Sequence, residues 1–285
     1  MFRKSVYLTL IMTFIGASAH AQKMIGAPSE QDMYCSNVYT PQALPDNLYV
    51  ISGEEPEKYV AYSQGNTVYI NRGSSDGVKV GDEFLVSRED HDALKQEWFK
   101  SQNMLIGAMG RLYEDIGRLR VVSVEPKTSA ALVVSACDLM YRGDIVQPFS
   151  ERTAPPYKPA TKFDVYAPPS GKAKAMIVSF KGFAVSGGEG AIVYVNLGGT
   201  QGVKVGDYFR VFEYPGYNDE YAYREKNTQY ELYGFGSTPV PYSSKELPRS
   251  LLGEGIVVRV GPNAATVLLT DSLREIFAGD YVELE

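Results

Sequence analysis

The chain contains 285 residues, carries a formal net charge of −6 at pH 7, and includes 27 Gly, 16 Pro and 21 Tyr but only 2 Cys and 2 His. The acidic balance argues against nucleic acid as a partner, because phosphates require a basic surface, and against electrostatic docking on anionic lipid. So few histidines exclude a multi-histidine metal centre, and we expect neither a metal nor an organic cofactor.

Residues 1–21 have the features of a secretory signal peptide. Two basic residues precede a mostly apolar stretch at 6–15, and Ala19-His20-Ala21 matches a small-x-small cleavage site. An uncleaved anchor is the alternative, but the stretch is too short to span a bilayer, and no later segment is long and apolar enough to do so. We expect a mature chain that starts near Gln22 and is exported to the periplasm or cell envelope, or secreted.

Residues 22–45 are polar with scattered prolines and predict an extended N-terminal arm. Residues 46–147 then contain short runs rich in β-branched and aromatic residues and bounded by Gly, Pro or Asp, which predict strands. A short helix is expected over 92–100. The strand-like runs are 48–52, 68–71, 83–87, 119–124, 130–136 and 144–147.

Prolines crowd residues 148–172 and predict a semi-stiff, extended linker. The strand pattern restarts in residues 173–285, with one helical turn expected over 273–277. These later strand-like runs are 175–180, 192–196, 208–213, 255–260, 265–270 and 280–284.

An internal duplication relates the two parts. The motif Gly-Val-Lys-Val-Gly-Asp occurs at 77–82 and at 202–207, inside a frame of 19 residues of which 12 are identical at an offset of 125. Further matches, such as Gly143-Asp144 with Gly279-Asp280, follow at an offset of 136. A duplicated unit is typical of binding or scaffolding proteins rather than of a single catalytic cleft.

Each copy spans about 100 residues, the size of a small domain. Its five or six short strands and tight glycine turns predict a small antiparallel barrel or rolled sheet of SH3-like size. The predicted fold class is therefore mainly β: two tandem SH3-like barrels from an internal duplication, joined by the proline-rich linker.

We interpret the repeated motif as a structural turn. The glycines allow a tight loop. The two valines are expected to face the core and the lysine between them to face solvent. The carboxylate after the last glycine is expected to accept hydrogen bonds from nearby backbone N–H groups. The alternative is an anion cradle with Lys79 and Lys204, but the spacing differs from that of phosphate-binding loops. The turn residues are Gly73, Gly77, Gly81, Asp82, Gly198, Gly202, Gly206 and Asp207.

Cys35 and Cys137 are the only cysteines. In an exported protein two cysteines most simply form one disulfide, which would fasten the arm to the first copy. Two unpaired buried thiols are the alternative.

The first copy has an opening strand that ends in Asn-x-Gly at 71–73, followed by a Gly-Val-x-x-Gly-Asp turn at 77–82. A Gly-x-(apolar)-x-Val-x-x-Val stretch at 117–124 and a closing Gly-Asp at 143–144 complete this frame, and the second copy matches similarly. This frame resembles the C-terminal domain of the flagellar assembly protein T family. The resemblance implies a small β-barrel module in a bacterial periplasmic protein that binds partners and has no catalytic residues.

The second copy carries a long insertion at 212–252 that is rich in tyrosine. Tyrosine combines a flat apolar ring with a polar tip, which suits contacts with sugar rings or protein surfaces. Alternatively, the rings fold this loop onto its own barrel or onto the first copy. The candidate contact residues are Tyr214, Tyr217, Tyr221, Tyr223, Tyr230, Tyr233 and Tyr242.

The first insertion holds Trp98 and Phe99, which either pack down or contact a partner. Its charged run 89–92 could bind a divalent ion, but adjacent charges cannot all face one centre, so a solvated loop is expected.

No nucleophile elbow of the Gly-x-Ser-x-Gly type is present, and both cysteines are expected in a disulfide. We therefore predict no enzyme, but an exported scaffold or assembly module that binds envelope proteins through its two repeats. The alternative is a carbohydrate- or peptidoglycan-binding protein that uses the tyrosine-rich insertion. A carboxylate pair of the glycosidase type has little support, because two small barrels offer no deep cleft of the usual kind.

Overall fold

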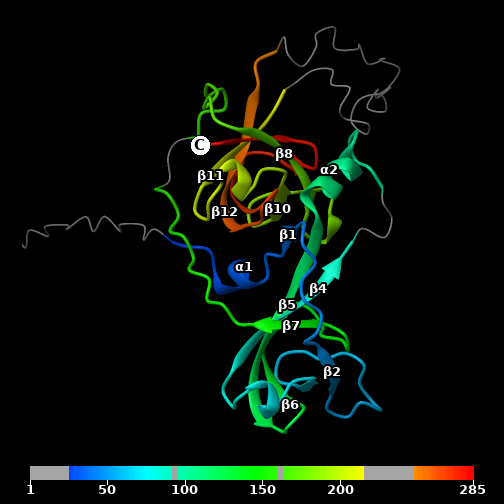
Figure 1. The fold of residues 1–285 in the computed structure, drawn as a ribbon. Coiled ribbons are helices and arrows are strands. Elements are labelled where there is room, and N and C mark those ends of the chain that lie inside the picture. Colours follow the sequence, from blue (N-terminus) through cyan, green and yellow to red (C-terminus); the bar gives the residue numbers. More distant parts are fainter. Residues whose placement is uncertain (1–25, 92–95, 160–162, 215–246) are drawn as a thin grey trace, which may run out of the picture.

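The computed structural model describes residues 26–91, 96–159, 163–214 and 247–285. Within these ranges the protein is mainly β, as predicted, and its strands gather into two units that lie one above the other in Figure 1. The first unit comprises strands β2 to β7, and the second comprises strands β8 to β15. An N-terminal arm and the segment between the units contact both of them.

The first unit is an antiparallel sheet with strand order β2-β3-β6-β5-β4-β7, and β1 pairs with β5 as a seventh strand. Side chains alternate across it: in β3, Val68 and Ile70 are buried while Tyr69 faces solvent. The buried side chains form one apolar cluster. The strands are β1 (Val38–Thr40), β2 (Val50–Gly53), β3 (Thr67–Ile70), β4 (Glu83–Asp90), β5 (Arg111–Val124), β6 (Ser129–Ala136) and β7 (Ile145–Pro148).

The second unit is a closed antiparallel barrel with strand order β10-β13-β12-β11-β15-β8. A separate two-stranded sheet pairs β9 (Ser186–Gly187) with β14 (Ile276–Phe277). Every residue of β10 is buried, which explains its continuous apolar run. The barrel strands are β8 (Lys174–Phe180), β10 (Ile192–Val195), β11 (Tyr208–Glu213), β12 (Ser250–Val260), β13 (Ala265–Ser272) and β15 (Tyr281–Leu284).

The two units also share the register of their strand pairs. Shifting the first-unit pair Tyr69↔Ala130 by the two sequence offsets gives Tyr194↔Thr266, and that pair is present in the second unit. A shift of 136 on both strands converts the β5–β6 pairs into the β12–β13 pairs. The register irregularity after Val121 recurs after Val257. The duplication therefore extends from sequence to backbone pairing.

The units differ in how their edge strands meet. In the barrel, β8 and β15 form a continuous pair that includes Met176↔Tyr281. The equivalent contact in the first unit is the isolated bridge Tyr49↔Ile145. Flanking backbone bonds support that bridge, with Val146 N donating to Leu48 O at 2.9 Å.

Each predicted strand-like run overlaps an observed strand, but β5 and β12 begin well before their predicted starts. The early part of β5 carries Arg111, Glu114 and Asp115, which hide the alternation. It is extended because β1 pairs with it on one side and β4 on the other. Neither partner strand is visible from the local pattern of β5.

The expected helices were placed wrongly. Of the helix expected over 92–100, residues 92–95 lie outside the described residues and residues 96–100 are not helical; α2 (Gln102–Met109) begins just after them. It ends at Gly110, where a Cβ would lie 2.5 Å from the carbonyl oxygen of Thr40, so only glycine fits against the arm. Residues 276–277, expected in a helical turn, form strand β14 instead.

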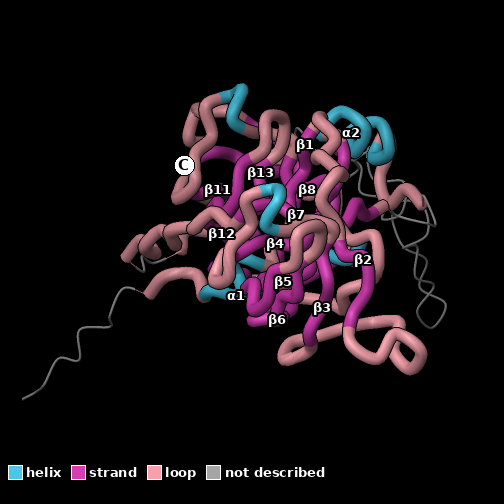
Figure 2. The backbone as a smooth tube through the Cα atoms, turned by 60° about the horizontal axis from the view of Figure 1, so that its bottom comes forward, coloured by secondary structure: helices cyan, strands magenta, loops and turns pink. Residues whose placement is uncertain are grey.

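The segment predicted as an extended arm contains a helix and a strand. Helix α1 (Glu30–Tyr34) starts at a capping box, in which Ser29 and Asp32 exchange backbone and side-chain hydrogen bonds. Strand β1 follows it. Both elements lie between the first sheet and the barrel (Figure 1), so the arm is part of the contact between the units. Figure 2, with strands in magenta and helices in cyan, shows that strands predominate over helices throughout the described chain.

Candidate functional site

The repeated motif forms the same turn in both units. Gly77 and Gly202 have φ angles of 88° and 87°, and Gly81 and Gly206 both have 94°. These angles lie in the left-handed region, which favours glycine over residues with a Cβ. The glycines are thus required by the backbone conformation at these positions.

The aspartates after these glycines accept backbone hydrogen bonds. The Asp82 carboxylate accepts from Lys79 N at 2.9 Å, and that of Asp207 accepts from Lys204 N at 2.8 Å. Two further carboxylates do the same: Asp144 accepts from Tyr141 N and Asp280 from Phe277 N. All four therefore stabilise local turns.

The loop between Gly73 and Gly77 docks on a neighbouring hairpin. Ser74 N and Ser75 N donate to the carbonyls of Glu125 and Pro126, and the second unit repeats both bonds. Because these N–H groups point at protein carbonyls, they do not face a common anion.

Only one valine of each motif packs inward. Val203 is buried, whereas Val205 and its counterpart Val80 are exposed, although the alternation predicted that both valines would face the core. Residues 77–82 and 202–207 form turns and not a strand, so the alternation of a strand does not apply to these valines.

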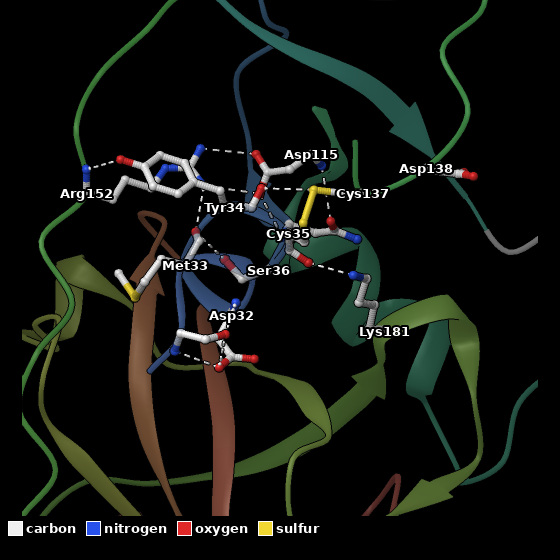
Figure 3. Close-up of a disulfide and its surroundings, with 12 residues drawn as sticks. Asp32, Met33, Tyr34, Cys35, Ser36, Asp115, Cys137, Asp138, Arg152 and Lys181 are labelled. Atoms are coloured by element: carbon white, nitrogen blue, oxygen red, sulfur yellow. Dashed lines mark hydrogen bonds and ion pairs between the residues drawn. A yellow bond between two sulfur atoms is a disulfide. The ribbon is translucent and has the colours of Figure 1, made fainter. Parts of the chain in front are cut away.

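The predicted disulfide is confirmed. It joins Cys35, directly after α1, to Cys137, directly after β6, with Cα atoms 5.5 Å apart (Figure 3). The bond fastens the arm to the first unit and closes a loop with a sequence separation of 102.

The same arm also binds the second unit. Lys181 Nζ donates to Cys35 O at 2.6 Å, and Thr266 Oγ1 donates to Asn37 O at 3.0 Å. The ring of Tyr39 meets that of Tyr194 edge to face, with centroids 5.2 Å apart. Apolar side chains of the arm and both units form one cluster around these contacts.

Asp115, buried in β5, is the ionic centre of this contact. Its carboxylate accepts from Arg152 at 3.1 and 3.2 Å and from Arg259 of the second unit at 2.8 and 2.7 Å. The backbone N–H of Asn37 adds a bond at 3.0 Å. One carboxylate of the first unit thus binds the arm, the segment that follows β7 and the second unit.

Opposing effects act on this carboxylate. Burial alone would raise the pKa of Asp115, but the attraction of Arg259 and the hydrogen bond from Arg152 outweigh burial. The pKa therefore lies below its ordinary value, and the group is ionised at neutral pH.

The first insertion lies against the second unit. Phe99 is buried in the apolar core of the barrel. Gln102 links the first insertion to barrel strand β8. Its Oε1 accepts from Trp98 N, and its Nε2 donates to Val178 O, each at 2.7 Å. Trp98 itself is half-buried.

Of the candidate tyrosines, only Tyr214 lies in a described range. Its ring contacts Phe212 and Tyr281, with centroids 5.6 and 5.7 Å away. Nearby, the buried Arg249 donates to Glu283 at 2.7 Å, and these contacts join the two ends of the insertion to the barrel. The remaining candidates, Tyr217, Tyr221, Tyr223, Tyr230, Tyr233 and Tyr242, lie outside the described residues.

A groove of about 430 Å³ opens beside α1, between the arm and the segment that follows β7. Tyr34 stacks on Phe149 in its wall, with ring centroids 5.6 Å apart. The guanidinium groups of Arg118 and Arg152 lie 3.9 Å from the Phe149 ring and 5.1 Å from the Tyr34 ring. Such stacking fixes the segment after β7 against the arm.

Within the described ranges, no group of three or more His, Cys, Asp or Glu side chains is placed to hold a metal ion. Glu89 forms an ion pair with Arg111, and His91 is exposed, while Asp92 lies outside the described residues. In the same part of the chain, no helix has the length and apolar character needed to cross a bilayer.

Sequence reasoning missed the contact between the units. Asp115 bonds to Asn37 across 78 residues of sequence and to Arg259 across 144, and no local pattern connects these positions. No local signal singled out Asp115, because Glu114 beside it is also charged and the two residues lie in a part of β5 that the sequence pattern did not predict as a strand.

Neither a family model nor a curated protein sequence matches the chain.

Proposed function

We propose that the chain is an exported, non-catalytic protein of the bacterial cell envelope that acts as a protein-binding scaffold built from two copies of one SH3-like barrel. The first copy is then a barrel closed by the bridge Tyr49↔Ile145, in the place where the second copy has a full strand pair. The resemblance to the flagellar assembly protein T C-terminal domain supports this view, as does the shared register.

The observation that carries the proposal is the joining of two equivalent units by one arm. The arm is bound covalently to the first unit at Cys137 and through Lys181 and Thr266 to the second. Two similar surfaces held at a fixed spacing can engage one partner at two points, which raises avidity without any new contact. A catalytic protein needs no such arrangement.

The test is site-specific photo-cross-linking in the native envelope. The cross-linker replaces Val80 or Val205, the equivalent exposed valines of the two units, and products are identified by mass spectrometry. We expect one defined envelope protein to be captured from both positions. Capture of nothing from either position, with turnover of a substrate by the purified protein, would contradict a scaffold.

The carbohydrate-binding alternative is tested on purified cell-wall sacculi. Retention of the protein on sacculi that is lost when Tyr217, Tyr221 and Tyr223 are changed to Ala would favour the glycan function over the scaffold. Retention that is absent, or unchanged by those substitutions, rules the glycan function out.

A further inference from the structure

The duplication provides an internal reference for surfaces. In the second unit, one outer face carries Ser179, Tyr194, Val258 and Leu268, each at most 4% exposed. The arm covers this face together with Met109 of α2 and Leu112 of β5. The hydroxyl of Tyr39 lies 3.4 Å from Ser179 Oγ, and its ring contacts Tyr194. This face is therefore a surface that binds a tyrosine from a short extended segment.

The same face of the first unit has no such cover in the described part of the chain. Register equivalence maps the four residues onto Ser52, Tyr69, Val122 and Leu132, and the residue type is the same at every position. Here Tyr69 is 39% exposed and Val122 is 47% exposed. We call these four residues the first-unit face.

Neighbouring positions on the two faces have diverged. Arg259, which binds Asp115, is replaced by Ser123 in the first unit, and the buried Ile256 is replaced by the exposed Arg120. The first-unit face thus keeps the side chains that receive a tyrosine but lacks the arginine that locks the arm permanently. This combination suits reversible binding rather than a permanent intramolecular contact.

We propose that the first-unit face is a docking surface for a tyrosine-bearing extended segment of a partner protein, held in the way that the second unit holds Tyr39. The proposal rests on the scaffold function and names its contact surface. Val80 is also exposed, in the turn whose Gly81 N donates to Val121 O of the same sheet.

The arm itself supplies the probe. A synthetic peptide with the sequence of residues 29–41, carrying Ser in place of Cys35, is titrated into the purified full-length protein while amide shifts are followed by NMR. The arm already occupies the equivalent face of the second unit. We therefore expect saturable shifts at Tyr69 and Val122, with a Kd on the order of 0.1–1 mM.

Matched changes separate docking from folding. Tyr69→Ala should weaken peptide binding at least about tenfold, a loss of about 1.4 kcal/mol. Tyr141→Ala is the control, because Tyr141 has the same 39% exposure as Tyr69 but lies in the loop between β6 and β7 rather than in β3. Changing Tyr39 of the peptide to Ala should weaken binding to the wild-type protein as well. The loss should be at least as large as the loss that Tyr69→Ala in the protein causes for the unchanged peptide.

Absence of saturable shifts at the first-unit face, or equal losses from Tyr69→Ala and Tyr141→Ala, would overturn the proposal. So would a concentration-dependent dimer in sedimentation that Tyr69→Ala abolishes, since a second copy would then be the occupant. Either result leaves the scaffold function open to its own cross-linking test, so the two failures are distinguishable.

Discussion

Replacing Asp115 with Asn removes a buried charge without changing the side-chain volume much. In the native protein this carboxylate is the counter-ion that Arg152 and Arg259 share, and its side chain is only 3% exposed. The amide of Asn cannot balance either arginine. Both guanidinium groups would then be largely buried without a counterion, because their side chains are 15% and 23% exposed.

Removing one partner of a buried ion pair typically costs about 3–5 kcal/mol. We expect Asp115→Asn to destabilise the protein by an amount in that range at pH 7, measured by urea unfolding. The control is Glu89→Gln, which breaks the ion pair with Arg111 on the surface. Exposed pairs contribute little, so the control should leave the unfolding midpoint essentially unchanged.

The pH dependence gives a second check. Because the pKa of Asp115 in the folded protein lies below its ordinary value, the stabilisation by its charge is complete above the ordinary carboxyl pKa of about 4. It is lost as the pH falls through the lower, folded-state pKa. The stability difference between wild type and Asp115→Asn should therefore shrink in acid. A loss below about 1 kcal/mol at pH 7, or a difference that grows in acid, would refute the role assigned to Asp115.

Three further perturbations have defined outcomes. Changing Cys35 and Cys137 together to Ser should cost about 4–5 kcal/mol in urea unfolding, because the disulfide closes a long loop; no change on reduction of the wild type would contradict this. Gly77→Ala should cost about 1–2 kcal/mol because of its positive φ, while Gly107→Ala inside α2 should stabilise by about 0.5–1 kcal/mol; equal effects would argue against the left-handed turn. Phe99→Ala should lower the free energy of unfolding by about 3–5 kcal/mol and raise amide hydrogen exchange in the barrel strands. Exchange that rises only in the first unit would contradict the position of Phe99 in the barrel core.

Local pattern was enough to locate part of each strand in the first sheet's path and in the barrel, but not β1, β9 or β14. Alternation in β3, with Val68 and Ile70 inward, and continuous burial in β10 produce the short apolar runs that mark strands. Repetition of the Gly-Val-Lys-Val-Gly-Asp turn at 77–82 and 202–207 indicated the duplication. The disulfide followed from the presence of only two cysteines in a chain expected to be exported.

Contacts between distant segments were beyond this kind of reasoning. Strand β1 has three residues and exists because β5 pairs with it, and α1 has five residues with only one buried. Short elements of this kind carry almost no periodic signal. The ionic cluster at Asp115 likewise depends on tertiary placement, since its partners Arg152 and Arg259 lie 37 and 144 residues away.

The duplication also shows how two copies of one sequence pattern can acquire different surroundings. Tyr69 and Tyr194 occupy the same register position, yet one is exposed and the other is fully buried. The difference arises from the arm and from Met109 and Leu112 of the first unit, which pack in one cluster with Tyr194. Burial therefore could not be predicted from the repeat alone.

The fixed placement of the two units, on which the scaffold proposal depends, is tested most directly by the distance between spin labels on them. Labels at Lys127 and Glu189, both exposed and outside the contact between the units, would be measured by double electron–electron resonance. We predict one narrow distance distribution that broadens in Asp115→Asn. A broad distribution in the wild type, unchanged by that substitution, would contradict a rigid two-unit body.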